Sequence, residues 1–349
     1  SLDLYSDNIS INFETAVYEN LNKNDNDRYE YIFPKFSLIK NFNDFSYLDG
    51  NLSFESDNII SQYRTNILEK RNINNIIFDS ITKINNFGII NNYQFLIRNT
   101  NSENKNTDYK NSKNFYLSGI YQYNSELPLK KQDTYYQKIL KPKLSFRAAP
   151  RHTKDEKNKE RKIDLSNVYS LDRATDGTSI EGGLSLTYGI NYSIIDKLRS
   201  AETLNIKLAN NLRLSNNNDL TNTNQIGEKT SNIFSEVIYS PNNFLTTKYS
   251  TAIKNNINEI AYENLSSELK FNKFLTKFDY LNENNPISKY SYLSNTSTYN
   301  IDKFNSFSFS TRKNKTKDLT EYYNLMYQYK NDCLAASIEY NKDFYSKVS

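Results

Sequence analysis

Between residues 180 and 192 the chain alternates strictly between two kinds of residue. The even positions, Ile180, Gly182, Leu184, Leu186, Tyr188, Ile190 and Tyr192, are apolar or glycine; the odd ones, Glu181, Gly183, Ser185, Thr187, Gly189 and Asn191, are polar or glycine. Only a β-strand separates such a pattern onto two opposite faces, because successive side chains point to opposite sides. Soluble strands usually have roughly 5–6 residues, whereas a tilted strand that crosses a bilayer needs roughly 9–11. The pattern therefore predicts one long strand, and it raises the question of a membrane barrel.

The same period-2 alternation recurs along most of the chain, whereas helical periodicity is hard to find. It is clearest in residues 89–97, 115–123, 204–208, 245–253, 274–280, 307–309, 323–329 and 334–340. The sequence predicts about 18 strands in all, best defined from residue 75 onward. No stretch of roughly 18 apolar residues is present, so we expect no transmembrane helix.

The composition of the 349-residue chain is hydrophilic overall, with a mean hydropathy of −0.77. Disordered chains are poor in aromatic residues, yet this one holds 29 Tyr and 20 Phe. A porin-like chain combines these properties, because half of its barrel surface faces water and its loops are polar. The 44 basic and 40 acidic residues are too evenly balanced to indicate a nucleic-acid partner.

The connectors between the predicted strands differ in length. Compact polar turns are expected at residues 85–88, 195–202, 240–243, 272–273, 300–303 and 331–332, and mostly longer loops alternate with them at 99–113, 150–178, 215–231, 282–287 and 313–319. The connectors at 125–134 and 254–258 blur this contrast. Short turns on one side and long loops on the other are typical of an antiparallel outer-membrane barrel, with the turns in the periplasm. A soluble β-sandwich or solenoid is the alternative.

Aromatic residues gather near the ends of the predicted strands. Examples are Tyr121, Tyr123, Tyr322, Tyr323, Tyr327 and Tyr329. In a membrane barrel they would form the interfacial girdles, where a ring with a polar tip is favoured. In a soluble β-sandwich the same side chains would pack in the core or against side chains of neighbouring strands.

The sequence gives no support for catalysis, a metal site or a cofactor. The chain has one His, His152, and one Cys, Cys333, which lie far apart in the sequence. One residue of each type provides neither a metal-ligand set nor a nucleophile–base pair. His152 belongs to a charged segment, residues 151–162, that could contact lipid phosphates or simply form a solvated loop.

Cys333 follows the predicted turn at residues 331–332 and starts the last predicted strand. A lone Cys is often a small buried hydrophobe. In the barrel topology, however, Cys333 lies at the periplasmic end, where conditions are oxidising. An unpaired Cys in an exported chain suggests a disulfide partner on another segment.

Two stretches of the chain carry a set of motifs that occur together. One extends from Lys141 through the loop to Gly189, and the other covers residues 327–337 around Asp332 and Cys333. The residues that define the motifs are Pro142, Phe146, Pro150, Asp172, Arg173, Gly177, Gly182, Gly183, Tyr188, Gly189, Asp332 and Cys333. In order and spacing they resemble the barrel of the LptD family, the lipopolysaccharide-assembly outer-membrane proteins also called organic-solvent-tolerance proteins.

The resemblance implies a barrel of about 26 strands in the Gram-negative outer membrane. It also implies a lipoprotein plug, LptE, in the lumen and a periplasmic jellyroll that receives lipopolysaccharide from periplasmic bridge proteins. By the same resemblance, Cys333 would form a disulfide with a cysteine of the N-terminal region. Because Leu334 follows Cys333, where some relatives have a second cysteine, at most one bridge would form there.

On this basis residues 1–349 are interpreted as one barrel domain, a partial one that lacks the jellyroll, the first strands, the lateral gate and the last strand. The expected function is translocation of lipopolysaccharide into the outer leaflet, with outer-membrane lipid around the barrel. A general porin or receptor barrel is the first alternative, and a soluble β-rich adhesin is the second. None of these functions is enzymatic.

Overall fold

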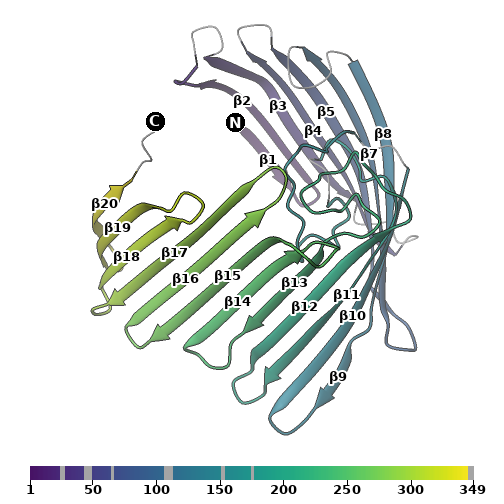
Figure 1. Cartoon of the computed structure of the whole chain (residues 1–349). Helices are drawn as coiled ribbons and strands as arrows, with labels where there is room; N and C mark the ends of the chain where they lie inside the picture. The colour runs from purple at the N-terminus through teal and green to yellow at the C-terminus, as the bar shows by residue number, and fades with distance from the viewer. Residues whose placement is uncertain are drawn as a thin grey trace.

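The computed structural model describes residues 1–23, 28–42, 49–63, 67–105, 113–150, 154–173 and 177–344. Within these residues the chain is all-β, with twenty antiparallel strands in one curved sheet (Figure 1). None of the described residues forms a helix long and apolar enough to span a membrane. The predicted all-β, antiparallel barrel-type fold is confirmed.

The strands run in chain order around the sheet. Their bounds are β1 Leu2–Ser6, β2 Ile9–Glu19, β3 Tyr29–Phe42, β4 Gly50–Tyr63, β5 Leu68–Ser80, β6 Lys83–Ile84, β7 Ile90–Lys105, β8 Lys113–Glu126, β9 Leu129–Gln132, β10 Tyr136–Ala149, β11 Gly183–Asp196, β12 Ala201–Arg213, β13 Ile233–Tyr239, β14 Leu245–Ile253, β15 Ile260–Phe271, β16 Phe274–Asn284, β17 Lys289–Asn300, β18 Asn305–Asn314, β19 Leu319–Lys330 and β20 Ala335–Asp343.

Two of the twenty strands extend a neighbour and add no new position to the sheet. β6 continues β5 along β7 with a register shift of one residue. β9 continues β8 along β10 in an unchanged register. The described strands therefore occupy 18 positions, which are the twenty strands less β6 and β9. This number agrees with the count expected from the sequence.

The alternation that predicts β11 separates its side chains as expected from residue 184 onward. Leu184, Tyr188 and Ile190 are each about 40% exposed on the outer face. On the inner face Ser185 and Thr187 are 4% and 2% exposed.

The predicted start of this strand at Ile180 is wrong. The strand begins at Gly183, whose φ of +104° lies in a region that favours glycine and lets the chain leave the sheet. Ile180 is 1% exposed and packs against Leu96 and Ile120 inside the curve of the sheet. Period-2 alternation in a loop that is folded against a sheet therefore imitates a longer strand.

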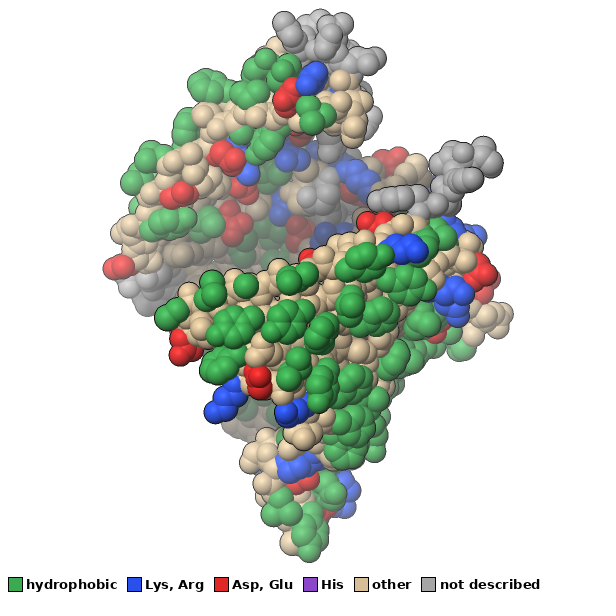
Figure 2. Space-filling model, turned by 90° about the vertical axis from the view of Figure 1, so that its left-hand side faces the viewer, with side chains coloured by type: hydrophobic (Ala, Val, Ile, Leu, Met, Phe, Trp, Pro, Cys, Tyr) green, Lys and Arg blue, Asp and Glu red, His purple; other side chains and the backbone are tan. Residues whose placement is uncertain are grey.

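The outer face is apolar over most of the sheet, and hydrophobic side chains dominate it in Figure 2. Its aromatic residues gather near the short turns, where the ring centroids of Phe244 and Phe271 lie 6.1 Å apart and those of Phe304 and Tyr329 lie 6.3 Å apart. Tyr121 and Tyr123, on β8, are 42% and 38% exposed. An apolar surface with aromatic residues near its margin is the arrangement that a bilayer stabilises.

The turns expected on one side are present, but the contrast in connector length is smaller than predicted. β16 and β17 extend to residues 284 and 289, and β18 and β19 to residues 314 and 319, so the long loops expected at 282–287 and 313–319 are wrong. β7 continues to Lys105 within the loop expected at 99–113. These strand ends are rich in Asn, Lys and Thr, and hydropathy does not separate a polar strand end from a loop. Residues 106–112 lie outside the described part of the chain.

Two long connectors fold back against the concave inner face, as the loops in front of β7 and β8 in Figure 1 illustrate. Their described parts are residues 150, 154–173 and 177–182, between β10 and β11, and residues 214–232, between β12 and β13. A small apolar core forms beneath them, in which Ile163 and Val168 of the first connector contact Ala209, Phe234 and Ala252 of the sheet. We call the described parts of these two connectors the inner layer.

At the margins of the sheet, β1 pairs with β2 and β20 pairs with β19. Among the described residues no pairing joins β1 to β20. Backbone groups at a lipid-exposed edge cannot remain without partners. Within a bilayer both edges must therefore be paired, with each other or with further strands.

Replacing Ile190 by Arg tests which face contacts lipid. Ile190 lies near the middle of β11 on the outer face, so a charge there should lower the free energy of unfolding by about 2–4 kcal/mol in vesicles. Leu198→Arg, in the exposed turn after β11, is the matched control and should cost less than about 0.5 kcal/mol. Urea unfolding in lipid vesicles measures both, and equal costs would show that Ile190 does not face hydrocarbon.

Candidate functional site

The inner face of the sheet carries a buried cluster of charged side chains. Arg98 lies on β7, Arg147 on β10 and Arg213 on β12, while Arg173 and Glu181 belong to the inner layer. All five are between 1% and 6% exposed. Isolated charges are rarely buried, because the loss of hydration must be offset by partners.

The strand register explains why the arginines converge. Arg147 of β10 pairs with Ser185 of β11, and Ser185 pairs with Arg213 of β12, so the three form one row across the inner face. The small Ser185 between two long side chains leaves room above it. The carboxylate of Glu181 and the guanidinium of Arg173 occupy this room, and Arg173 donates to the Ser185 hydroxyl at 3.2 Å.

Arg173 and Glu181 form a two-pronged ion pair at the centre of the cluster. Arg173 Nε lies 2.9 Å from Glu181 Oε2, and Arg173 Nη2 lies 2.9 Å from Glu181 Oε1. Arg173 also donates to the carbonyl of Val168 and to Thr187 Oγ1, both at 2.6 Å, and to Asn211 Oδ1 at 2.8 Å. The side chain thus joins the inner layer to β11 and β12.

Arg147 and Arg213 also bind the carboxylate of Glu181. Arg147 Nη1 lies 3.5 Å from Glu181 Oε2, and Arg147 Nη2 donates to Gln122 Oε1 at 2.9 Å. Arg213 donates to Glu181 Oε1 and to the carbonyl of Gly182. Glu181 therefore accepts from three guanidinium groups at once.

A second ion pair attaches the inner layer to β7. Arg98 Nη1 lies 2.6 Å from Asp172 Oδ2 and 2.9 Å from the carbonyl oxygen of Ser179, and Arg98 Nε donates to Asn75 Oδ1 at 2.8 Å. Next to it, the Thr100 hydroxyl donates to the carbonyl of Thr178 at 3.0 Å. Asp172 and the backbone at residues 178 and 179 are thus bound to β7 of the sheet, which we call the barrel wall.

The cluster has an excess of positive charge. Four arginines face the two carboxylates Asp172 and Glu181, which leaves two positive charges over. Desolvation by burial favours a higher pKa for Glu181, but the charges of Arg173, Arg147 and Arg213 and the hydrogen bond from Arg173 outweigh it. The pKa of this carboxyl therefore lies well below its ordinary value, and Glu181 is ionised.

The two connectors of the inner layer support each other. The hydroxyl of Thr221 donates to the carbonyl of Lys159 at 2.7 Å, and Asn224 donates to the carbonyl of Arg161 at 2.7 Å. The Lys162 ammonium lies 3.7 Å from the centroid of the Tyr262 ring on β15. The charged segment 151–162 was expected to be solvated or in contact with lipid phosphates. Of its described residues, Asp155, Lys157, Asn158, Glu160 and Lys162 are exposed, as a solvated loop predicts, while Glu156 is buried and the second connector binds the backbone at Lys159 and Arg161. His152 lies outside the described residues.

The structure brings together some of the sequence-predicted site residues. Asp172 and Arg173 take part in the two ion pairs, and Gly182 accepts from Arg213. At Gly183 an added Cβ would come within 2.8 Å of Arg213, and at Gly189 it would collide with the hydroxyl of Tyr169 and a backbone oxygen of β12. Arginine side chains and the inner layer can approach β11 closely because these positions have no side chain.

The remaining predicted residues lie elsewhere. Pro142, Phe146 and Tyr188 are on the strands, and the last two are outward and 42% exposed. Pro150 begins the long connector, and Gly177 adopts a φ of +87° within it.

Asp332 and Cys333 lie in the turn between β19 and β20, away from the ion-pair cluster. Cys333 does not start the last strand, which begins at Ala335. The backbone N–H of Cys333 donates to Asn331 Oδ1 at 2.9 Å. This hydrogen bond forms an Asx-type turn that ends before the strand. The thiol is exposed, and the disulfide remains a prediction.

The sequence analysis did not single out the wall arginines Arg98, Arg147 and Arg213. A signal was present, since Arg147 sits between the outward Phe146 and Ala148 in an alternating strand, which places it on the inner face. Its partners come from segments distant in sequence, and nothing local identifies them.

Comparisons with known proteins give no family. No family model matches the chain, and no curated protein matches its sequence. Among solved structures it is similar to a mutant of the Rh. blastica porin, with 9% identity, a TM-score of 0.32 and coverage of 80% of this chain and 86% of that one. It is also similar to a mutant ferric enterobactin receptor of Pseudomonas aeruginosa in complex with enterobactin, with 8% identity and a TM-score of 0.43. This match covers 95% of the chain but spans only 63% of the receptor. At such identities and TM-scores, we base no argument on these two structures.

Neutralising Glu181 should release the inner layer from the wall. Glu181→Gln leaves three buried guanidinium groups without their shared carboxylate, a change that typically costs about 3–5 kcal/mol. We expect trypsin to cleave the folded barrel within residues 154–162 at least tenfold faster. Glu160→Gln removes an exposed charge from the same segment, and its amide oxygen can still accept from the Ser288 hydroxyl, which lies 2.8 Å from Glu160 Oε1, so the cleavage rate should be unchanged. If both variants resist trypsin like the wild type, the cluster does not hold the inner layer.

The depressed pKa of Glu181 predicts how the inner layer responds to acid. A carboxyl whose pKa is lower in the folded state stabilises that state above its unfolded pKa, about 4.3, and this contribution is lost as the pH falls toward the folded value. Hydrogen exchange of residues 154–182, corrected for intrinsic rates, should therefore show the same protection at pH 7 and pH 5 and lose it only below about pH 4. Loss of protection between pH 7 and pH 5 would contradict this assignment.

Proposed function

We propose that the chain forms the wall of a transport barrel in the Gram-negative outer membrane. The observation that carries this proposal is the separation of an apolar outer face from a polar, charged inner face on one antiparallel sheet of 18 strand positions. Such a wall lets a hydrophilic or amphiphilic solute cross while the outside contacts hydrocarbon. The function is passage through a lumen, and it requires no catalytic residue or cofactor.

Within this class we propose lipopolysaccharide as the transported molecule. Three observations support this finer proposal: the resemblance to the LptD family, the position of Asp172 and Arg173 in the inner layer with Gly183 and Gly189 on β11 beside it, and the two excess positive charges of the cluster. These guanidinium groups are buried and occupied by partners in the protein, so their excess charge would attract phosphorylated sugars through the field in the lumen and not by direct contact. The proposed partners follow from the resemblance: a lipoprotein plug of the LptE type, and periplasmic bridge proteins.

A general porin or receptor barrel is the second candidate. The inner layer narrows the lumen with a net positive cluster, which is also the arrangement of an anion-selective constriction. This candidate needs only the wall and its charge, so it rests on fewer assumptions than lipopolysaccharide transport.

Depletion of the full-length protein in its native host separates these two functions. Loss of a lipopolysaccharide translocon should lower newly made lipopolysaccharide at the cell surface, measured by pulse labelling and an outer-leaflet-modifying enzyme. Steady ion conductance of the purified full-length protein in planar bilayers, with unchanged surface lipopolysaccharide after depletion, would support the porin and contradict the translocon.

The disulfide of Cys333 is a further prediction of the translocon proposal. In the full-length protein, reductant should change the mobility of the folded barrel on a non-reducing gel, and Cys333→Ser should abolish this change. If the mobility shift and the amount of assembled barrel are the same in Cys333→Ser, Cys333 forms no such bond.

A further inference from the structure

The outer face contains a polar patch where lipid contact would favour apolar residues. It spans β4, β5 and β7, in which the side chains of Ile60, Ile76 and Ile97 are exposed on the outer face. Because side chains alternate along a strand, residues an even number of positions from these share that face. They include Ser56, Asn58, Asn72, Asn74, Asn99 and Asn101, which we call the amide patch.

The strand register arranges the amide patch in two rows. One row runs Ser56, Asn74, Asn99 and the other runs Asn58, Asn72, Asn101, each across β4, β5 and β7. Each row continues on both sides into apolar residues: Leu38 and Leu117 flank the first row, and Phe36 and Phe115 flank the second. Phe115 and Leu117 are 73% and 60% exposed. The amides therefore form an island at the height of apolar residues, and are not part of a polar rim.

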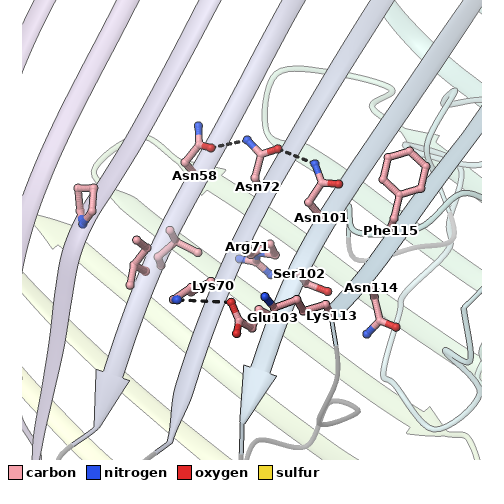
Figure 3. Close-up of a pocket in the computed structure, with 13 residues that line it drawn as sticks. Asn58, Lys70, Arg71, Asn72, Asn101, Ser102, Glu103, Lys113, Asn114 and Phe115 are labelled. Atoms are coloured by element: carbon pink, nitrogen blue, oxygen red, sulfur yellow. Dashed lines mark hydrogen bonds and ion pairs between the residues drawn. The ribbon is translucent and has the colours of Figure 1, made fainter.

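Hydrogen bonds between the side chains fix the amides in place (Figure 3). Asn101 Nδ2 donates to Asn72 Oδ1 at 2.9 Å, and Asn72 in turn donates to Asn58 Oδ1. In the other row, Ser56 Oγ donates to Asn74 Oδ1 at 2.7 Å. Each Asn has two N–H donors and an oxygen with two lone pairs, so such a ladder orients the amides without using all of their capacity.

A groove of about 540 Å³ lies over the second row and the adjacent row, which is drawn below it in Figure 3. In that adjacent row, Lys70 pairs in register with Glu103, and Glu103 with Lys113. Lys70 Nζ lies 3.4 Å from Glu103 Oε2, in a half-exposed ion pair. Two ammonium groups against one carboxylate leave one positive charge at the edge of the groove, next to the amide donors.

We propose that this groove binds the phosphate-bearing headgroup of a bilayer lipid. The amides and the two lysines offer donors and positive charge to the phosphate, while Phe115 and Leu117 offer an apolar track for an acyl chain. An apolar acyl chain or protein segment over the patch would leave the remaining donors and acceptors of the amides unsatisfied, which is costly in lipid. The site is on the outside of the wall and does not depend on what passes through the lumen.

Native mass spectrometry of the folded full-length chain in detergent tests this site. The probes are phosphatidylglycerol, diacylglycerol with the same acyl chains, and inorganic phosphate. We expect the wild type to retain phosphatidylglycerol at least tenfold better than diacylglycerol, and inorganic phosphate not to compete at millimolar concentration. Equal retention of the two lipids, or displacement of phosphatidylglycerol by inorganic phosphate, would overturn the proposal.

Variants locate the binding on the outer face. Asn58→Leu/Asn72→Leu/Asn101→Leu and, separately, Lys70→Gln/Lys113→Gln should each lower retention of phosphatidylglycerol at least fivefold. The lysine variant changes exposed side chains, so it tests the site even if the triple variant does not fold. Thr276→Val/Ser297→Ala is the matched control, because it removes another hydrogen-bonded polar pair, joined at 2.8 Å, from the outer face of β16 and β17. Retention that is unchanged in the lysine variant, or lowered equally in the control, would contradict a site at the groove.

Discussion

Every backbone N–H and C=O group that lies in hydrocarbon must find its hydrogen-bond partner within the protein, and the whole architecture depends on this constraint. The chain meets it with long antiparallel strands, and from β2 to β19 each strand except the short β6 and β9 pairs with a strand on both sides. One consequence is that side chains alternate between lipid and lumen along every strand. The same backbone pattern therefore produces the apolar outside, the polar inside and the hydrophilic average composition.

The inner layer is held against the sheet by the carboxylate of Glu181 and the arginines that bind it. Glu181 accepts from Arg147, Arg173 and Arg213, which come from β10, the inner layer and β12. Hydrogen bonds to charged groups are among the stronger ones in proteins, and here burial excludes competing water. The cluster thus joins the inner layer to the sheet, and it leaves an excess of positive charge beneath the inner layer.

Much of the fold could be predicted from the sequence, because the period-2 pattern is local. The all-β class, the number of strand positions and the outward side of β11 all follow from it. The pattern failed at Ile180, where a loop packed on the sheet shows the same alternation, and near Asn284 and Asn314, where strands end in polar residues.

The candidate site was less predictable. The resemblance identified Asp172 and Arg173, but their partners Arg98 and Glu181 become neighbours only through the sheet and the folded connector. The amide patch could not be predicted for the same reason, because its members become neighbours only in the folded sheet. Each Asn of the patch looks like an ordinary polar residue in a weak strand, and only the register aligns the six side chains on the lipid-facing surface.

Thiol labelling along β18 tests most directly whether this sheet is a barrel wall in a membrane. In a Cys333→Ser background, single cysteines would be placed at the inward positions Ser306, Ser308 and Ser310 and at the outward positions Phe307 and Phe309. With the full-length protein in lipid vesicles, a water-soluble maleimide should label the three inward cysteines and leave the two outward ones unreacted. Equal labelling at all five positions would contradict the account.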